Sequence, residues 1–374
     1  MNDQLLLPVV VVWASLATLL AWVPWPRWQP LAIALCGIGL LATLSPIALL
    51  LLGAGTLLTF AVARRGAISK RALMASVVLI TGVFGGFLLA SRHASEGIGT
   101  RIVLPLGLAF FCLRLIHYLF ESYKSALPAH RFTEYLCYQF LPSALPAGPI
   151  HRFNEFQRDL RRKRWDSEAF SRGAQRVLYG LAKIVILGNY LLGEELAHAL
   201  QGAMTYPGFT GAYLSALMFW AKLYVLFSGY SDIAIGFAAT MGFNIRENFI
   251  RPYSARNIRE FWQRWHFSLS SWCRDYVFTP VLSATRMQGF AVLASMVVLG
   301  LWHDLSLRYL LWGAYHGAGI AVFRWFDAKA GARIDALPPG WAGAWTVLAT
   351  AITLHFVLFS FQATSVLQRI ISGI

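Results

Sequence analysis

The sequence carries little charge for its length. Only 13% of its 374 residues are Asp, Glu, Lys or Arg, whereas 57% are hydrophobic. A soluble domain averages about 25% charged and 45–50% apolar residues. A single globular core cannot absorb this much apolar surface, but a bilayer can, because a membrane-spanning helix needs roughly 20 mostly apolar residues. The composition therefore predicts an integral membrane protein.

Closely paired cysteines and the motifs of several common enzyme classes are also missing. The four cysteines, none of them in CxxC spacing, predict small buried side chains rather than a disulfide framework or a zinc site. The sequence has no P-loop, no GxSxG and no HExxH motif. It also has no repeat of 20–50 residues, no low-complexity tract and no linker. We therefore expect one membrane-embedded domain over residues 1–374, without a metal site.

Apolar segments recur along the whole chain. The N-terminal "MNDQ" has no basic side chain, so we expect a retained first helix rather than a cleaved signal peptide. Some segments are too short to cross a bilayer, and the Gly-Pro-rich Leu141–Ile150 predicts a helix break. We expect an all-α, polytopic fold with roughly 11 transmembrane helices and two or three re-entrant or interfacial segments. The candidate segments are about 5–23, 30–44, 46–63, 72–90, 102–120, 132–148, 173–194, 209–228, 230–242, 265–283, 288–302, 309–325 and 341–365.

The net charge of +15 first suggests a nucleic-acid partner. The basic residues, however, gather between apolar segments, as membrane topology would place them. The richest stretches are Arg64–Arg71, His151–Arg164 and Arg246–Arg264. The positive-inside rule predicts that these three faces are cytoplasmic. The expected partner is the lipid bilayer, not a nucleic acid.

Arginine alternates with aromatic and apolar residues in "NIRENFIRPYSARNIREFWQRWHFSLSSW" (Asn244–Trp272). This pattern is typical of an interfacial amphipathic segment anchored by Trp and Arg. It also suits the roof of a cytoplasmic entrance for an anionic donor, because arginine pairs well with phosphate. The two interpretations are compatible, and both stay open.

Two of the nine histidines stand out. His303 lies near the end of the apolar run Gly289–Asp304, and His266 opens another mostly apolar stretch. An ionisable side chain within a membrane segment is costly and marks a functional hypothesis. A neutral imidazole also suits general-base catalysis near neutral pH. A lone histidine is more often structural, and His355 is expected only to bond a neighbouring helix.

Four longer stretches strengthen the argument. They are "LRLIHYLFESYK" (Leu113–Lys124), "FLPSALPAGPIHRFNEF" (Phe140–Phe156), the stretch from Phe227 to Val281, and "LWHDLSLRYLLWGAYHG" (Leu301–Gly317). In these stretches the chain resembles the membrane-bound O-acyltransferase family, in the bacterial branch of alginate O-acetylases and teichoic-acid D-alanyl transfer proteins. The resemblance covers roughly residues 100–325. Residues 1–90 match only in hydropathy, and 340–366 are expected to hold a C-terminal helix.

The resemblance implies a fold around a central funnel or tunnel in the bacterial cytoplasmic (inner) membrane. It implies a thioester donor on the cytoplasmic side, either acyl-CoA (acetyl-CoA first) or an acyl carrier protein, and no bound cofactor. The acceptor would be a hydroxyl group of an extracytoplasmic polysaccharide or envelope polymer. A secreted or periplasmic relay protein of the SGNH type would take the acyl group onward.

The resemblance also implies roles for single residues. His303, in the "WH" motif, and His266, in "RWH", fall on the family's two histidine positions, and we predict that they are catalytic and face one cavity. Trp302, Asp304 and His316 are expected to support them. Relatives commonly have glycine where this chain has Asp304, which could pair with Arg308 four residues on. The candidates for donor binding are Asn248, Tyr253, Arg256, Asn257 and Arg264.

Three alternatives to polysaccharide acetylation stay open. The nearest is D-alanyl transfer from a carrier protein to an envelope polymer. A transporter or channel would also explain intramembrane histidines, although it would predict inverted repeats that the sequence lacks. The third is a scaffold that has lost catalysis.

Overall fold

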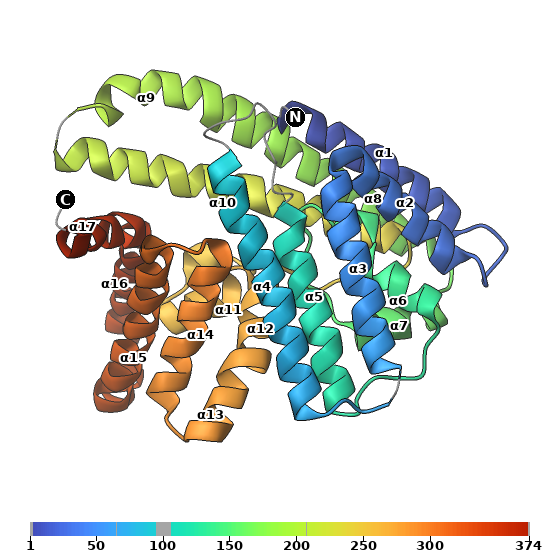
Figure 1. The fold of residues 1–374 in the computed structure, drawn as a ribbon. Helices are drawn as coiled ribbons and strands as arrows, with labels where there is room; N and C mark the ends of the chain where they lie inside the picture. The colour runs from blue at the N-terminus through green and yellow to red at the C-terminus, as the bar shows by residue number, and fades with distance from the viewer. Residues whose placement is uncertain (1–2, 65, 95–105, 207, 373–374) are drawn as a thin grey trace. The chain divides into compact units, whose positions relative to one another are not determined.

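The computed structural model describes residues 3–64, 66–94, 106–206 and 208–372 (Figure 1). These residues form helices and connecting loops, with no strand among them, as the sequence predicts. The chain divides into two compact units. The first holds residues up to Leu187 and from Val225 to Arg246, and the second holds Gly188–Tyr224 and the residues from Glu247 onward.

The first unit is built from apolar helices and two short amphipathic ones. Its helices are α1 (Asp3–Ala21), α2 (Gln29–Leu44), α3 (Pro46–Ala63), α4 (Lys70–Ala94), α5 (Leu106–Tyr123), α6 (Phe132–Gln139), α7 (Phe153–Arg162), α8 (Ser167–Ala182) and the second half of α10 (Phe209–Thr240). The expected helix break is confirmed, because α6 ends at Gln139 and only a 3₁₀ turn follows, Pro142–Ala144. The start of the expected segment 102–120 lies outside the described residues.

Stacked aromatic rings form the core of the first unit. The rings of Tyr118 and Tyr135 stack with their centroids 3.9 Å apart, and Phe153 meets the edge of the Tyr138 ring at 5.3 Å. All four side chains are fully buried. The Tyr135 hydroxyl is 2.6 Å from the hydroxyl of Thr59 on α3, so its polar end is satisfied inside the core.

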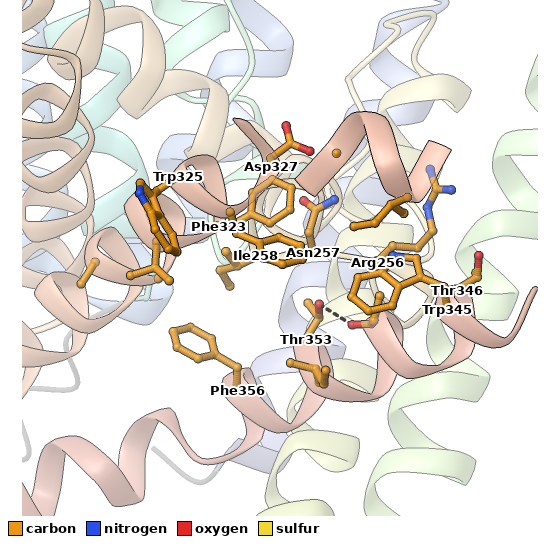
Figure 2. Close-up of a pocket in the computed structure, with 18 of the residues that line it drawn as sticks. Arg256, Asn257, Ile258, Phe323, Trp325, Asp327, Trp345, Thr346, Thr353 and Phe356 are labelled. Atoms are coloured by element: carbon orange, nitrogen blue, oxygen red, sulfur yellow. Dashed lines mark hydrogen bonds between the residues drawn. The ribbon is translucent and has the colours of Figure 1, made fainter. Parts of the chain in front are cut away.

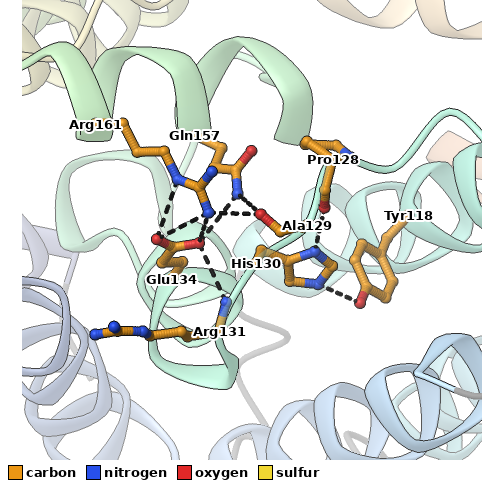
Figure 3. Close-up of polar contacts among 8 residues, drawn as sticks. All are labelled: Tyr118, Pro128, Ala129, His130, Arg131, Glu134, Gln157 and Arg161. Carbon is orange, nitrogen blue, oxygen red and sulfur yellow. Dashed lines mark hydrogen bonds and ion pairs between the residues drawn. The ribbon is translucent and has the colours of Figure 1, made fainter.

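An ion pair joins α6 to α7 (Figure 3). The Arg161 guanidinium donates to Glu134 at 3.0 Å, and the Gln157 amide donates to the same carboxylate at 3.0 Å. Glu134 also accepts from the backbone N–H of Arg131 at 3.2 Å and so caps α6. One carboxylate thereby satisfies donors from two helices.

The second unit contains His266, His303 and His316. Its helices are α9 (Leu196–Met204), the first half of α10, α11 (Ile258–Arg264), α12 (Phe267–Cys273), α13 (Thr279–Thr285), α14 (Gln288–His303), α15 (Leu307–Asp335), α16 (Pro339–Leu358) and α17 (Ser360–Ser372). π-Helical turns link α8 to α9 (Lys183–Glu195) and α12 to α13 (Arg274–Phe278). Helices α14 and α15 cross closely, because Gly300 and Gly313 leave each backbone open to the other.

Five helical stretches in the described part of the chain are long and apolar enough to cross a membrane, which supports a multi-pass membrane protein. They are Pro46–Ala63, Lys70–Ala90, Ser167–Met204, Phe209–Thr240 and Pro339–Leu358. Three shorter apolar helices are Leu6–Ala21, Gln29–Leu44 and Gln288–His303. The expected count of roughly 11 transmembrane helices is not confirmed.

Two segment predictions need correction. The expected separate segments 209–228 and 230–242 form a single helix, α10. The expected single segment 341–365 is divided between α16 and α17 at Phe359.

Candidate active site

His303 is the last residue of α14 and lies among aromatic rings. Its ring centroid is 4.7 Å from that of Trp302, 5.9 Å from Tyr309 and 5.7 Å from Trp312. Because α14 and α15 cross closely here, residues from both helices surround one imidazole. The helix ends at this position, so the imidazole sits where an apolar helix gives way to a turn.

His266 lies in the turn between α11 and α12. Its backbone adopts the left-handed conformation, with φ 47° and ψ 49°, which is uncommon for a residue with a side chain. The side chain is buried, and its ring centroid is 6.0 Å from that of Trp302. A left-handed residue costs of order 1–3 kcal/mol and persists only where its surroundings hold it, often at a functional site.

Asn248 holds this turn from the loop before α11. Its backbone carbonyl accepts from the N–H of Phe267 at 2.9 Å. Its side-chain oxygen accepts from the Ser268 hydroxyl at 2.7 Å. On the other side of the turn, Ile250 donates its N–H to the carbonyl of Arg264 at 2.9 Å. The loop therefore fixes the chain on both sides of His266.

His316 lies on α15, fully buried in an aromatic box. The surrounding ring centroids are those of Trp262 at 5.1 Å, Trp312 at 4.7 Å, Tyr315 at 5.4 Å and Phe356 at 5.6 Å. Neither ring nitrogen of His316 has a hydrogen-bond partner among the described residues. A buried polar side chain without partners is unusual.

The three histidines are thus linked through two tryptophans. Trp302 contacts His266 and His303, and Trp312 contacts His303 and His316. The structure brings the sequence-predicted His266, Trp302, His303 and His316 into one cluster. A single cavity faced by both His266 and His303 stays a prediction.

Asp304 caps the end of α14 in an extended conformation, with φ −164° and ψ 134°. It is therefore outside the helix, so helical spacing no longer supports a pair with Arg308, which stays a prediction. The Arg308 guanidinium lies 5.3 Å from the centroid of the Phe361 ring.

The remaining candidates for donor binding are spread around α11. Tyr253 is exposed, and Arg256 lies 3.7 Å from Glu260. Asn257 caps α11 by accepting from the N–H of Glu260 at 2.8 Å. Arg264 donates to the hydroxyl of Ser254 and pairs with Glu260. These contacts give Glu260 and Asn257 a role in shaping the helix start.

A cavity of about 340 Å³ lies against the histidine cluster and was missed in the sequence analysis. Trp262, which contacts His316, lines it, and so does Phe267, the neighbour of His266. Three arginines also line this cavity, Arg259, Arg274 and Arg324. The other lining residues are Gln263, Ser270, Ser271, Cys273, Phe278, Gln288, Val292, Ser295, Met296, Leu299 and Ile320. Arg259, Trp262 and Gln263 follow the helical three- and four-residue spacing, which was the available signal.

No group of three or more His, Cys, Asp or Glu side chains in the described ranges has a geometry that could hold a metal ion. What the cluster offers chemically is imidazole nitrogens in a water-poor aromatic setting. Such groups can accept or donate one proton at a fixed place. The arginines of the neighbouring cavity can bind an anion.

Comparisons with known proteins agree with these motifs. Residues 71–363 match the model of MBOAT, the membrane-bound O-acyltransferase family. A probable alginate O-acetylase of Pseudomonas aeruginosa is 33% identical over 276 residues, which cover 72% of this chain and 51% of that protein. A teichoic acid D-alanyltransferase of Bacillus subtilis is 29% identical, over 70% of this chain and 68% of the relative. A peptidoglycan O-acetyltransferase of Helicobacter pylori is 25% identical, over 73% of this chain and 57% of that protein. The chain thus spans about half the length of the alginate O-acetylase that it matches.

Proposed function

The chain belongs to the membrane-bound O-acyltransferase family, and from this premise we propose that it moves an acyl group, acetyl first, from a thioester to a hydroxyl group. The acceptor is a polysaccharide or envelope polymer outside the cytoplasm, reached directly or through a secreted relay protein of the SGNH type. The protein works in the bacterial cytoplasmic membrane, with its arginine-rich loops on the cytoplasmic side. The names of the relatives support acyl transfer to such polymers.

One observation carries the proposal: His266 and His303, distant in sequence, both contact Trp302. In the reaction His303 takes the proton of the acceptor hydroxyl as its oxygen attacks the thioester carbonyl. The new C–O bond forms, the C–S bond breaks, and the leaving thiolate recovers a proton from the imidazolium. His266 hydrogen-bonds the carbonyl oxygen or positions the acceptor. Holding both reactants at one place supplies proximity and orientation.

The cavity lined by Arg259, Arg274 and Arg324 suits the donor. CoA and a carrier protein present the same phosphopantetheine arm, with phosphate at one end and the thioester at the other. The arginines would bind the phosphate, and the hydroxyls of Ser270 and Ser271 would hydrogen-bond the amides of the arm. At about 340 Å³ the cavity is near the lower end of ligand sites, which suits the arm rather than a whole nucleotide.

D-alanyl transfer is the second candidate, and one observation favours it. The chain covers 68% of the Bacillus subtilis D-alanyltransferase but 51% of the alginate O-acetylase. The donor then would be D-alanine on a carrier protein, which reaches the same cavity through the same arm.

The test measures acyl transfer in membranes with matched expression of the wild type, His303→Ala and His266→Ala. Labelled acetyl-CoA is offered in one arm and carrier-bound D-alanine in the other. We expect His303→Ala to lose about 10²–10⁴-fold in one of the two arms. The matched control is His355→Ala, since His355 is an exposed histidine on the candidate membrane helix α16 and lies 3.2 Å from the Tyr213 hydroxyl. Equal transfer by the wild type and His303→Ala would remove His303 as the base.

The donor cavity has its own test. Arg259→Gln with Arg324→Gln should raise the KM for the thioester several-fold and weaken its salt dependence, with a smaller change in kcat. A loss of kcat at unchanged KM would place the donor elsewhere.

A further inference from the structure

A second and larger cavity lies between α15 and α16 (Figure 2). The rings of Tyr315 and Phe356 stack between the two helices at 4.2 Å, and those of Phe326 and Trp345 at 6.1 Å. Both pairs line a cleft of about 800 Å³. The backbones of α15 and α16 otherwise approach each other at few places, unlike those of α14 and α15. The two helices are therefore held apart by side chains, with a cleft left in the space.

The cleft follows the two helices over a length comparable with the thickness of a membrane. Its lining residues on α15 run from Tyr315 to Asp335, a length of about 30 Å for helical residues. The other wall, α16, is one of the five candidate membrane spans. That length exceeds one leaflet of hydrocarbon, about 15 Å. Most of the lining is apolar, so hydrocarbon fits the cleft better than water does.

Charge is confined to one part of the cleft. Asp327 and Asp335 lie in the last third of α15. Arg256, in the turn before α11, also lines the cleft. All three are exposed, and neither aspartate has an ion-pair partner in the described part of the chain. Tyr315 and Phe356 line the cleft nearer the start of α15 and the end of α16. The cleft thus has a charged end of both signs and an apolar end.

We propose that this cleft binds a phospholipid whose headgroup carries a primary ammonium, phosphatidylethanolamine, with one acyl chain along α15. Arg256 binds the phosphate, and Asp327 accepts hydrogen bonds from the ammonium group. Asp335 lies eight residues further along α15, about 12 Å away, and adds negative charge at the same end of the cleft. A quaternary ammonium has no N–H to donate, so phosphatidylcholine loses those bonds. Phosphatidylglycerol has no cation for the aspartates. The cleft shares Tyr315 and Phe356 with the aromatic box around His316, and Arg256 and Asn257 with the donor-binding candidates, but the lipid proposal does not rest on the proposed reaction.

The experiment uses the full chain reconstituted in nanodiscs with equal amounts of phosphatidylethanolamine, phosphatidylcholine and phosphatidylglycerol. After transfer to detergent and washing, native mass spectrometry counts the retained lipids. We expect phosphatidylethanolamine to be retained several-fold over the other two. Asp327→Asn with Asp335→Asn should abolish this preference while a lipid is still retained.

A second variant tests the cleft itself. Ala318 lines the cleft, whereas Ala328 is exposed on the same helix and does not line it. Ala318→Phe should reduce the retained lipid several-fold, and Ala328→Phe should not. If Ala318→Phe fails to fold, phosphatidylethanolamine with a photoactivatable acyl chain should label α15 and α16 in the wild type. Equal retention of the three lipids, equal retention by both variants, or labelling elsewhere would overturn the proposal.

Discussion

The backbone carbonyl of Asn248 accepts a hydrogen bond from the N–H of Phe267, the residue directly after His266, at 2.9 Å. Its side chain accepts a second bond from Ser268 at 2.7 Å. Asn248 is fully buried, so these bonds are shielded from water. We therefore propose that Asn248 positions the left-handed turn of His266, and its expected role in donor binding stays a prediction.

Asn248→Ala should lower kcat by about 10–100-fold, because a misplacement of about 1 Å can cost roughly 10²-fold. It should also lower stability by about 1–3 kcal/mol, since the buried Ser268 hydroxyl loses its acceptor. The measurements are acyl transfer and thermal unfolding in detergent, with the exposed Asn244→Ala as the control.

A double-mutant cycle separates positioning from donor binding. If the Asn248–Ser268 bond carries the effect, Asn248→Ala with Ser268→Ala should be little worse than Asn248→Ala alone. Purely additive losses, or a rise in KM at unchanged kcat, would instead assign Asn248 to the donor site.

The sequence was informative where local pattern decides structure. The apolar runs predict most helices of the first unit. The "WH" and "RWH" motifs single out His303 and His266, and the structure places both against Trp302. The sequence analysis expected two segments, 209–228 and 230–242, where α10 is a single helix. The reason is tertiary: Asp232, the charged residue near the division between these segments, is paired with Arg176 and Lys183 from outside α10. A contact so distant in sequence leaves no local signal.

The arginine-lined cavity was missed for a similar reason. Its three arginines come from α11, the π-helical turn after α12, and α15, and only packing brings them together.

The break between α16 and α17 at Phe359 also has a tertiary cause. There Ser360, buried at the start of α17, accepts a hydrogen bond from the indole N–H of Trp312 at 3.0 Å.

Paired glycines allow α8 and α10 to touch in the first unit. A Cβ on Gly173 would lie 2.8 Å from the carbonyl oxygen of Gly236, and one on Gly180 would lie 2.7 Å from that of Gly229. Real Cβ atoms do not approach so closely, so either alanine substitution must separate the helices. We expect Gly173→Ala or Gly180→Ala to lower stability by about 1–3 kcal/mol.

The matched control is Gly82→Ala on α4, where a Cβ would meet nothing within 4 Å. Alanine is a better helix former than glycine by about 1 kcal/mol, so this variant should be neutral or slightly stabilised. Thermal unfolding in detergent compares the three variants. A shift of the same sign and size in all of them would rule out the close glycine contacts as the cause.

Asp232 is shared by two cations. Its carboxylate lies 2.9 Å from the Arg176 guanidinium and 2.6 Å from the Lys183 ammonium. Asp232→Asn leaves both cations without their carboxylate. We expect a loss of about 1–3 kcal/mol, less than the roughly 3–5 kcal/mol for a fully buried pair, because solvent screens the partly exposed Lys183.

Glu168→Gln is the contrast for Asp232→Asn. Glu168 and Arg172 form an exposed pair on α8, with side chains 80% and 61% exposed. Such pairs typically contribute well under about 1 kcal/mol, so the melting temperature should hardly change. Equal losses of stability in Asp232→Asn and Glu168→Gln would show that burial does not set the strength of the ion pairs of Asp232 with Arg176 and Lys183.

Glu134 should make the stability of the first unit depend on pH. Burial by itself would raise the pKa of Glu134, but hydrogen bonds from Arg161, Gln157 and the Arg131 backbone outweigh it and hold that pKa below its ordinary 4.5. The unfolded chain binds this proton more readily than the folded one. The stabilisation is therefore fully present above the unfolded pKa of about 4.5 and is lost as the pH falls through the folded pKa. Glu134→Gln should be less stable than the wild type at pH 6, and the gap should narrow below about pH 4. Melting temperatures of both proteins between pH 3.5 and 7 test this, and a gap that is constant over that range would mean that the Glu134 charge does not stabilise the junction of α6 and α7.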